Sequence, residues 1–128
     1  MVTNRKIYIV KWAILYMKSY SIYDPYLDVS KELTAGAVLY VGRGDLEEMI
    51  LEAGSDVTTV DSTVVSRRHV ALDLISEQPK IRNHGSHNPA TLNGKLIPYS
   101  GWVDINDGNV IRMGPWVVRF DVKEEKIL

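Results

Sequence analysis

Apolar residues recur at every second position in two stretches of the chain, 68–75 and 116–122, as in β-strands that bury one face. The clearest case is 116–122, in which apolar residues on one face alternate with Val117, Arg119 and Asp121 on the other. Similar short apolar runs recur between turn residues about every eight to twelve positions, which predicts an all-β sandwich or barrel. The predicted strands cover 37–41, 57–60, 68–75, 80–82, 110–113 and 116–122.

The N-terminal segment 7–17, IYIVKWAILYM, is apolar and follows two basic residues, so it has to be distinguished from a targeting signal. Lys11 interrupts the apolar run, and no small-residue cleavage site follows it. The run is also shorter than the roughly 18 residues that a membrane span needs. Its β-branched and aromatic residues predict a buried first strand. We expect the polar, tyrosine-rich residues 19–34 that follow to form a loop.

One segment has helical spacing instead. Between residues 45 and 54, apolar residues fall at i, i+3, i+4 and i+7, which predicts a helix over 46–53. Asp45 could cap its first turn, with Glu48 three residues on, and Gly54 could close its last turn. The alternative interpretation of this segment is a strand through 49–51.

Turn residues divide the second half of the chain. Asn93-Gly94 is the strongest hairpin signal, because both residue types tolerate the positive φ angles of a two-residue turn. It joins two short strands within 91–97, and further turns are predicted at 107–109 and at Gly114-Pro115.

The composition fits an ordinary globular protein. The chain has 128 residues, of which 45% are hydrophobic and 24% charged, so we expect a single domain spanning 1–128. A formal net charge of −1 gives no overall attraction to nucleic acid or to an anionic membrane, and we expect neither as a direct partner. The absence of cysteine excludes thiolate chemistry and fits an intracellular protein.

The candidate catalytic and metal-binding residues form weak patterns. Ser66, His69 and Asp61 could be tried as a hydrolase triad, but no Gly-x-Ser-x-Gly motif surrounds the serine. His84 and His87 lie three residues apart in a polar loop without a carboxylate at metal-ligand spacing. We therefore expect neither an enzyme nor a metal site, and no cofactor.

Several ordered sequence blocks together resemble the forkhead-associated (FHA) domain, although none of them is specific alone. The resemblance covers residues 37–122 and implies an eleven-stranded β-sandwich whose apical loops bind phosphothreonine in extended peptides. Relative to a minimal member, the connection 19–35 and the helical segment 45–54 look like insertions, and 123–128 is a charged tail. The matching blocks are Gly42-Arg43, Ser66-Arg67-Arg68-His69, Gly85-Ser86-His87-Asn88, Asn93-Gly94 and 107–114.

By this resemblance, Arg43 is the main phosphate ligand and Ser66 donates its hydroxyl. Arg67 supplies its main-chain N–H and can add its guanidinium. A phosphothreonine carries close to two negative charges and three acceptor oxygens, so forked and hydroxyl donors suit it. Strand alternation directs Arg67 and His69 to one face and Arg68 to the other, so both arginines cannot point at one phosphate unless the backbone turns there. We therefore choose Arg67 over Arg68.

The resemblance also implies roles for residues around the phosphate. Asn88 and Ser86 would hold the peptide backbone, and Val64 lies in a loop that reads a neighbouring peptide side chain in some members of the family. His87 replaces a hydroxyl residue and could donate to phosphate as a neutral ring or, below about pH 6.5, as a cation. Architectural roles fall to Gly42, His69, Asn93 and Gly94.

The chain departs from the family pattern at His87-Asn88-Pro89-Ala90, where Ser or Thr followed by Asn-Gly-Thr is usual. Proline removes a donor and biases Asn88 toward extended geometry. Two functions follow as hypotheses: a phosphothreonine-dependent interaction module, and an FHA-fold structural or oligomerisation domain without phosphopeptide binding. For the first, family analogy implies a threonine-phosphorylated protein partner, kinase-dependent signalling such as the DNA-damage or cell-cycle response, a nuclear location, and a place within a longer multidomain chain.

Overall fold

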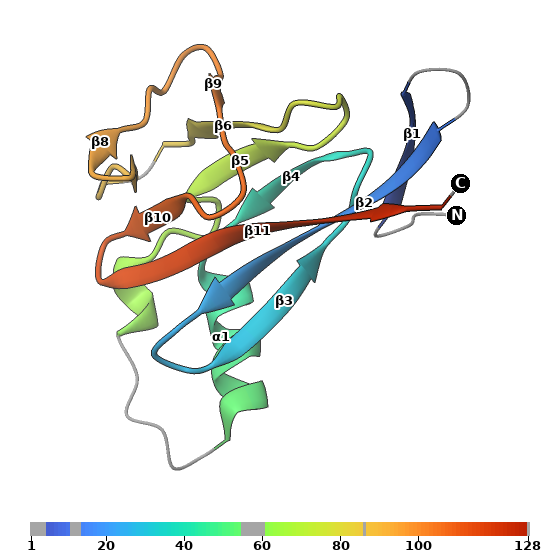
Figure 1. Cartoon of the computed structure of the whole chain (residues 1–128). Helices are drawn as coiled ribbons and strands as arrows, with labels where there is room; N and C mark the ends of the chain where they lie inside the picture. Colours follow the sequence, from blue (N-terminus) through green and yellow to red (C-terminus); the bar gives the residue numbers. More distant parts are fainter. Residues whose placement is uncertain (1–4, 11–13, 55–60, 86, 128) are drawn as a thin grey trace.

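Two antiparallel sheets stack face to face and enclose the core of the chain (Figure 1). The computed structural model describes residues 5–10, 14–54, 61–85 and 87–127. The elements are β1 (Arg5–Val10), β2 (Ile14–Asp24), β3 (Val29–Leu33), β4 (Val38–Val41), α1 (Arg43–Ala53), η1 (Ser62–Val64, a 3-10 helix), β5 (Val70–Asp73), β6 (Lys80–Asn83), β7 (Thr91–Leu92), β8 (Lys95–Leu96), β9 (Val103–Asp104), β10 (Val110–Met113) and β11 (Trp116–Lys126).

The larger sheet has the strand order β1-β2-β11-β10-β7-β8, with β3 also paired to β2. The smaller sheet has the order β4-β5-β6-β9. Each strand pair within the described residues is antiparallel, and the predicted all-β sandwich is confirmed.

The N-terminal region differs from the prediction of one buried strand over 7–17. β1 pairs with β2 as a hairpin, with Arg5 opposite Ser19 and Val10 opposite Ile14, and the side chain of Ile7 is 57% exposed. The single-strand prediction is wrong because the apolar run contains no Gly, Pro, Asn or Asp to mark where the chain reverses.

The predicted loop over 19–34 is also wrong. β2 continues through this region to Asp24, and β3 pairs back onto it, with Tyr20 opposite Leu33 and Asp24 opposite Val29. The polar residues lie mainly on the solvent face, while Tyr20 and Ile22 point into the core. The polar residues of the solvent face made this segment resemble a loop in sequence, although its other face belongs to a strand of the core.

The helix predicted over 46–53 is confirmed, and the alternative strand through 49–51 is excluded. α1 begins earlier than expected, because Gly42 is the N-cap residue and Arg43 the first helical residue. The predicted cap at Asp45 is therefore wrong: this residue lies inside the first turn, where its carboxylate accepts the N–H of Gly42 at 2.8 Å. At the other end, Gly54 donates its N–H to Ile50 at 3.2 Å, as expected.

The predicted strands of the smaller sheet are confirmed in β4, β5 and β6, although β5 is shorter than the predicted 68–75. Residues 67–68 form a turn, so the strand starts at Val70. The predicted strand 57–60 lies outside the described residues.

The predicted hairpin at Asn93-Gly94 joins β7 to β8, and both turn residues have positive φ, 50° and 83°. β10 and β11 also form as predicted. β11 runs beyond the predicted end at 122 and pairs with β2 as far as Lys126 opposite Tyr16, so most of the charged tail 123–128 is part of the sheet.

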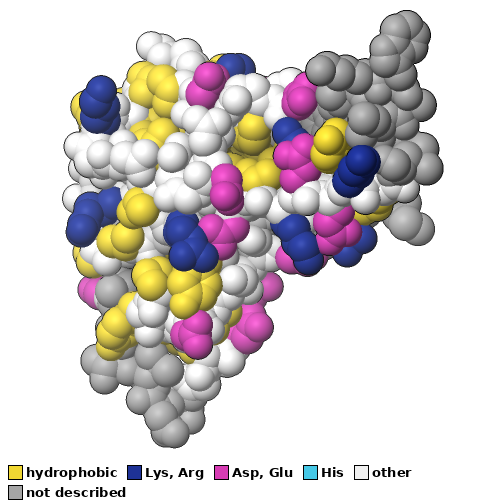
Figure 2. All heavy atoms as spheres, viewed as in Figure 1, with side chains coloured by type: hydrophobic (Ala, Val, Ile, Leu, Met, Phe, Trp, Pro, Cys, Tyr) yellow, Lys and Arg dark blue, Asp and Glu magenta, His cyan; other side chains and the backbone are white. Residues whose placement is uncertain are grey.

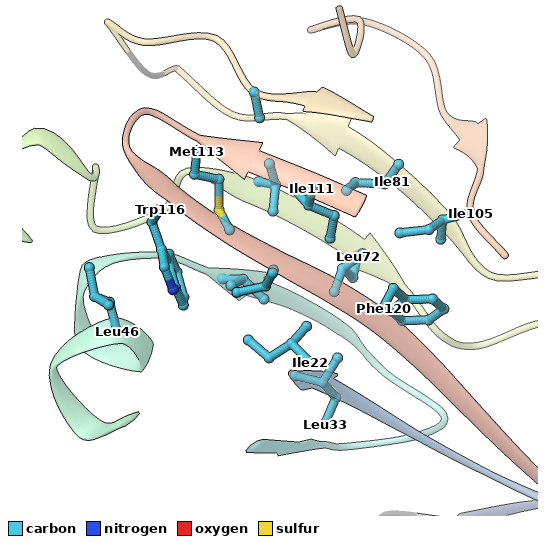
Figure 3. Packing of buried hydrophobic residues seen from close by; sticks show 14 of the residues in the cluster. Ile22, Leu33, Leu46, Leu72, Ile81, Ile105, Ile111, Met113, Trp116 and Phe120 are labelled. Atoms are coloured by element: carbon cyan, nitrogen blue, oxygen red, sulfur yellow. The ribbon is translucent and has the colours of Figure 1, made fainter. Parts of the chain in front are cut away.

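The core lies between the sheets and reaches the first turns of α1. Figure 3 shows side chains of both sheets, including Ile22, Ile111 and Phe120 from one and Leu72 and Ile81 from the other, pointing toward one another. Burying one such side chain contributes about 1.5–3 kcal/mol. This core fixes the strand ends that carry the candidate site.

Polar groups also contribute to the interior. Asp24 is 3% exposed, and its carboxylate accepts hydrogen bonds from the indole Nε1 of Trp116 at 3.0 Å and from the N–H groups of Tyr26 and Leu27.

On the outside, Figure 2 shows basic and acidic side chains interspersed over the face formed by β2, β3 and β11, in keeping with the pairs Arg119–Asp121 and Lys123–Glu125.

Within the described residues, no helix is long and apolar enough to cross a membrane. The same part of the chain contains no group of three or more His, Cys, Asp or Glu side chains arranged to hold a metal ion.

Candidate binding site

The sequence blocks of the predicted site meet at one end of the sandwich. The end of β4 leads into Gly42 and Arg43, η1 leads into the turn before β5, and the residues after β6 form a third loop beside them (Figure 1, left side). We call residues 42–43, 61–69 and 84–90 the loop end of the molecule.

Gly42 lets two of these segments approach closely. A Cβ atom at this position would lie 2.2 Å from the main-chain oxygen of Arg67 and 2.3 Å from that of Ser66. Its φ of −172° is open to any residue, so glycine is required here by the close contact. The neighbouring N–H of Arg43 donates to the same Ser66 oxygen at 3.0 Å, which fixes the start of α1 against the loop.

The guanidinium of Arg43 lies against the main chain of η1. Its Nε donates to the main-chain oxygens of Ser62 at 3.1 Å and Val65 at 3.0 Å, and its Nη2 donates to that of Thr63 at 3.2 Å. No carboxylate in the described residues forms an ion pair with it. A guanidinium has five N–H groups, so these contacts orient the group and leave three N–H donors for another ligand.

Asp61 closes the η1 turn. Its Oδ1 accepts hydrogen bonds from the hydroxyl of Thr63 at 2.6 Å and from the N–H of Thr63 at 2.9 Å. These two bonds lower the pKa of the Asp61 carboxyl, and the nearby positive charge of Arg43 adds to the effect. The turn that Arg43 grips is thus stabilised from within.

Asn88 reaches the same segment from the third loop. Its Nδ2 donates to the main-chain oxygen of Val64 at 3.1 Å. Arg43 and Asn88 therefore both bind the main chain of 62–65, and they do so from different loops. The Val64 side chain remains exposed, at 38%.

The buried side chain of His69 connects two of the loops. The ring is fully buried. Its Nδ1 accepts the N–H of Ser66 at 3.1 Å, so the proton lies on Nε2, which donates to the main-chain oxygen of Asn88 at 2.5 Å. Burial lowers the pKa of His69, and the bond to Asn88 opposes this shift. A neutral ring is the form that satisfies both contacts.

Arg67 and Arg68 occupy a turn, and both are exposed. The expectation that strand alternation would separate them, with Arg67 and His69 facing one way, is wrong because the strand begins only at Val70. Arg68 instead stacks on the ring of Tyr40, with 4.7 Å from its Cζ to the ring centroid. Arg67 makes no ion pair with any carboxylate in the described residues.

The remaining predicted residues lie around this centre. His87, Asn88 and Pro89 are exposed and Ser66 is half-buried, whereas Ser86 lies outside the described residues. Asn93 stands apart from the loop end: its Oδ1 accepts the N–H of Val110 at 2.8 Å and ties the hairpin to β10.

The hydrolase alternative has little support in this geometry. Asp61 bonds to Thr63, and both ring nitrogens of His69 contact main-chain atoms. The aspartate therefore does not orient the imidazole as a triad requires.

Sequence analysis missed Asn83. This residue is fully buried, and its side chain donates to the main-chain oxygens of Ala90 at 3.1 Å and Ile97 at 2.5 Å while accepting the N–H of Ala90 at 2.8 Å. It therefore fixes the end of the loop that carries Asn88. The available signal was its place in β6, two residues after the core residue Ile81 and on the same face.

A family model described as the FHA domain matches residues 39–114. Three solved structures share the fold at low sequence identity. The FHA domain of an Arabidopsis thaliana hypothetical protein is 20% identical with a TM-score of 0.59, over 80% of this chain and 83% of that chain. Mycobacterium tuberculosis EmbR, solved in complex with a low-affinity phosphopeptide, is 22% identical with a TM-score of 0.59, over 80% of this chain and 24% of that chain.

The FHA domain of human APLF, in complex with an XRCC1 bisphospho peptide, is 18% identical with a TM-score of 0.55, over 80% of this chain and 96% of that chain. No curated protein matches the sequence. The family match covers more than half of the chain and agrees with the two-sheet architecture. This protein belongs to the FHA-domain family.

Proposed function

We propose that this chain is a single, non-catalytic FHA domain that binds a threonine-phosphorylated segment of a partner protein at its loop end. The observation that carries the proposal is the state of Arg43: the guanidinium is oriented by three main-chain oxygens, free of carboxylate partners in the described residues, and left with unused donors. A doubly charged phosphate ester with three acceptor oxygens matches such a group.

Neighbouring donors complete the proposed phosphate site. Ser66 supplies a hydroxyl beside Arg43, to which its main-chain oxygen is already bonded. Arg67 supplies a second, exposed guanidinium and its main-chain N–H, and His87 adds a ring nitrogen from the third loop. Two members of the fold, EmbR and APLF, were solved with phosphorylated peptides, which supports the same ligand class here.

Asn88 is proposed to hold the peptide backbone beside the phosphothreonine, together with Ser86. Its Nδ2 donates to the main-chain oxygen of Val64, which places the Asn88 amide group beside the segment that Arg43 contacts. Val64, exposed at the edge of this site, is proposed to contact a neighbouring peptide side chain and to favour an apolar one.

The test is a degenerate phosphothreonine peptide screen followed by calorimetry on the selected peptide. We expect Arg67→Ala to weaken binding about tenfold or more, since charge-assisted hydrogen bonds contribute roughly 1.5–3 kcal/mol. Arg43→Ala should abolish measurable binding. Because Arg43 also holds η1, the melting temperature of the Arg43→Ala variant must be measured alongside. Arg67 is the complementary variant, since its side chain is exposed.

Arg112→Ala is the matched control, because this exposed arginine lies on β10 in the other sheet. Binding that is unchanged by Arg43→Ala and Arg67→Ala, or a folded wild-type protein that selects no phosphothreonine peptide, would contradict the proposal.

The second candidate function is an FHA-fold structural or oligomerisation domain that does not bind phosphate. Two observations favour it. Arg43 and Asn88 donate hydrogen bonds to main-chain oxygens of 62–65 within the domain itself, and Pro89 removes a donor where the family usually has glycine. A screen without phosphopeptide binding, combined with concentration-dependent self-association in sedimentation, would support this candidate.

We also propose an intracellular role in kinase-dependent signalling. The DNA-damage or cell-cycle response and a nuclear location are the more specific form of this proposal, and they rest on family analogy and on the likeness to APLF with its XRCC1 peptide. Colocalisation of the tagged protein with sites of DNA damage, lost in Arg67→Ala, would test them.

A further inference from the structure

The outer face of the smaller sheet carries a group of arginines and aromatic rings that the proposed phosphate site does not use. It starts within the loop end, at Arg68 and His84, and extends across β4, β5 and β6. We call it the outer-face cluster, and its members are Tyr40, Arg68, Arg82, His84 and Trp102.

Stacking contacts hold the cluster together. The Cζ of Arg68 lies 4.7 Å from the ring centroid of Tyr40, and the ring of His84 meets the same tyrosine edge-on with centroids 4.8 Å apart. The Cζ of Arg82 lies 5.0 Å from the ring centroid of Trp102. A guanidinium stacked on a ring keeps its N–H edges directed outward and loses less freedom when it binds a ligand.

Strand register places these residues on the solvent side of the sheet. Tyr40, Ala71 and Arg82 are directly opposite one another across β4, β5 and β6, while the alternate residues Val70 and Leu72 belong to the core. Ala71 is fully buried although it is not part of the core cluster. Its neighbours on the outer face therefore cover it, and Tyr40 remains 37% exposed.

The two arginines of the cluster are not held in ion pairs by described carboxylates. In the described residues, neither Arg68 nor Arg82 has a carboxylate within ion-pair distance, and Arg82 has only a 3.5 Å contact from Nη1 to the main-chain oxygen of Asn83. The acidic side chains of this sheet lie in the next row of the same face, two residues along each strand. There Asp104 is paired with Lys80 at 2.6 Å, and Asp73 accepts the N–H of Ile75.

The opposite sheet offers a comparison for these charges. The opposite sheet shows basic and acidic side chains interspersed (Figure 2), and the chain as a whole has a net charge of −1. What distinguishes the outer-face cluster is that Arg68, Arg82 and the adjoining Arg67 lie next to the loop end and form no ion pair with a carboxylate in the described residues.

The cluster is also continuous with the loop end. Arg68 follows Arg67 directly, and the N–H of His84 donates to the main-chain oxygen of His69 at 3.1 Å. An extended segment anchored by its phosphate at Arg43 and Arg67 can pass from the loops onto this face within a few residues, since an extended chain advances about 3.3 Å per residue.

We propose that the outer-face cluster binds acidic side chains of the same partner segment that carries the phosphothreonine, so that the domain selects phosphorylated sites flanked by Asp or Glu. This inference rests on the proposed function. Arg68 and Arg82 pair with the carboxylates by forked hydrogen bonds, and Tyr40 and Trp102 supply apolar surface for the intervening residues. An acidic peptide fits better than nucleic acid, because the chain has no overall positive field to attract a polyanion.

Calorimetry with three phosphothreonine peptides of equal length tests the inference. One has neutral flanks, one has Glu residues before the phosphothreonine, and one has Glu residues after it. We expect one acidic peptide to bind roughly five- to tenfold more tightly than the neutral one, the size expected for two exposed ion pairs. The double variant R68Q/R82Q should lose this preference and keep its affinity for the neutral peptide, whereas R112Q should retain both.

A second measurement follows the indole N–H resonance of Trp102 by NMR, which should shift with the preferred acidic peptide and not with the neutral one. Equal affinity for all three peptides, or an equal loss for neutral and acidic peptides in R68Q/R82Q, would overturn the inference while leaving phosphothreonine binding intact. Failure of the proposed function is distinguishable: then no phosphothreonine peptide binds, and the inference falls with it. Tighter binding of a single-stranded oligonucleotide through Arg68 and Arg82 would also overturn it.

Discussion

The main-chain N–H of Ser66 donates to Nδ1 of His69 at 3.1 Å, and this bond ties the proposed phosphate-binding loop to a buried imidazole. The other ring nitrogen contacts the main-chain oxygen of Asn88 at 2.5 Å. A single neutral side chain thus sets the positions of two segments of the proposed binding site. Protonation of Nδ1 would remove the acceptor for Ser66 and place a charge in the interior.

Stability should consequently fall in mild acid. Burial lowers the pKa of His69 in the folded state, whereas an unfolded histidine takes up a proton near pH 6.5. The contribution is fully present above about pH 6.5 and is lost as the pH falls from there toward the folded-state pKa. Urea denaturation between pH 7.5 and 5 should show this decline.

Direct NMR titration of the His69 ring identifies the source of the effect. The ring should titrate below pH 6.5. A His69 ring that titrates at or above 6.5 would contradict the prediction.

Gly42→Ala should destabilise the protein and disrupt the loop end. The added Cβ would meet two main-chain oxygens at 2.2 and 2.3 Å, and neither atom belongs to a flexible side chain. We expect a loss of about 3 kcal/mol in the free energy of unfolding, at the upper end for overpacking, together with weaker phosphopeptide binding.

Gly44→Ala is the matched control, two residues further along. A Cβ there meets no atom within 4 Å, and alanine in a helix is favoured over glycine by up to about 1 kcal/mol. It should be neutral or stabilising. Equal melting temperatures for the two variants would show that the close approach at Gly42 does not constrain the fold.

The sequence predicted those parts of the fold whose local signals agree with the tertiary structure. The Asn93-Gly94 turn needs positive φ at both positions, and both residue types tolerate it. The spacing of Leu46 and Met49 predicted α1 because both residues reach the core. The N-terminal hairpin was not predicted because the apolar run contains no turn residue that would separate β1 from β2.

The candidate site was predictable as a set of residues and not as a network. The ordered sequence blocks predicted that Arg43, Ser66 and Asn88 belong to one site. In the structure, the contacts of these residues are made with main-chain atoms of 62–65 and with His69. Main-chain acceptors leave no trace in residue identity, so those contacts could not be read from the sequence. The same limit hid the helical start at Arg43, which depends on how Gly42 meets the 66–67 main chain.

Asn83→Ala should destabilise the fold and loosen the loop that carries Asn88. The variant leaves the N–H of Ala90 and the main-chain oxygen of Ile97 without their side-chain partners in a buried setting, while the oxygen of Ala90 keeps the N–H of Ile97. Each orphaned group costs about 1–3 kcal/mol, so we expect a loss of roughly 2–5 kcal/mol in urea denaturation.

Asn106→Ala is the control, since this exposed side chain accepts one hydrogen bond from Gln78 at 3.2 Å. It should cost less than about 1 kcal/mol. If both variants lost the same stability, the buried contacts of Asn83 would not be what holds the 90–97 segment.

Matched peptides that differ only in phosphothreonine and phosphoserine should separate recognition of the phosphate from recognition of the residue that bears it. The two ligands present the same charge to Arg43 and Arg67, so a difference must come from the threonine methyl group. A methyl group that the loops enclose in a small apolar pocket is worth about 1–3 kcal/mol. We expect the phosphothreonine peptide to bind about tenfold more tightly than the phosphoserine peptide by calorimetry. Equal affinities would mean that the loops bind the phosphate group and do not recognise the methyl group.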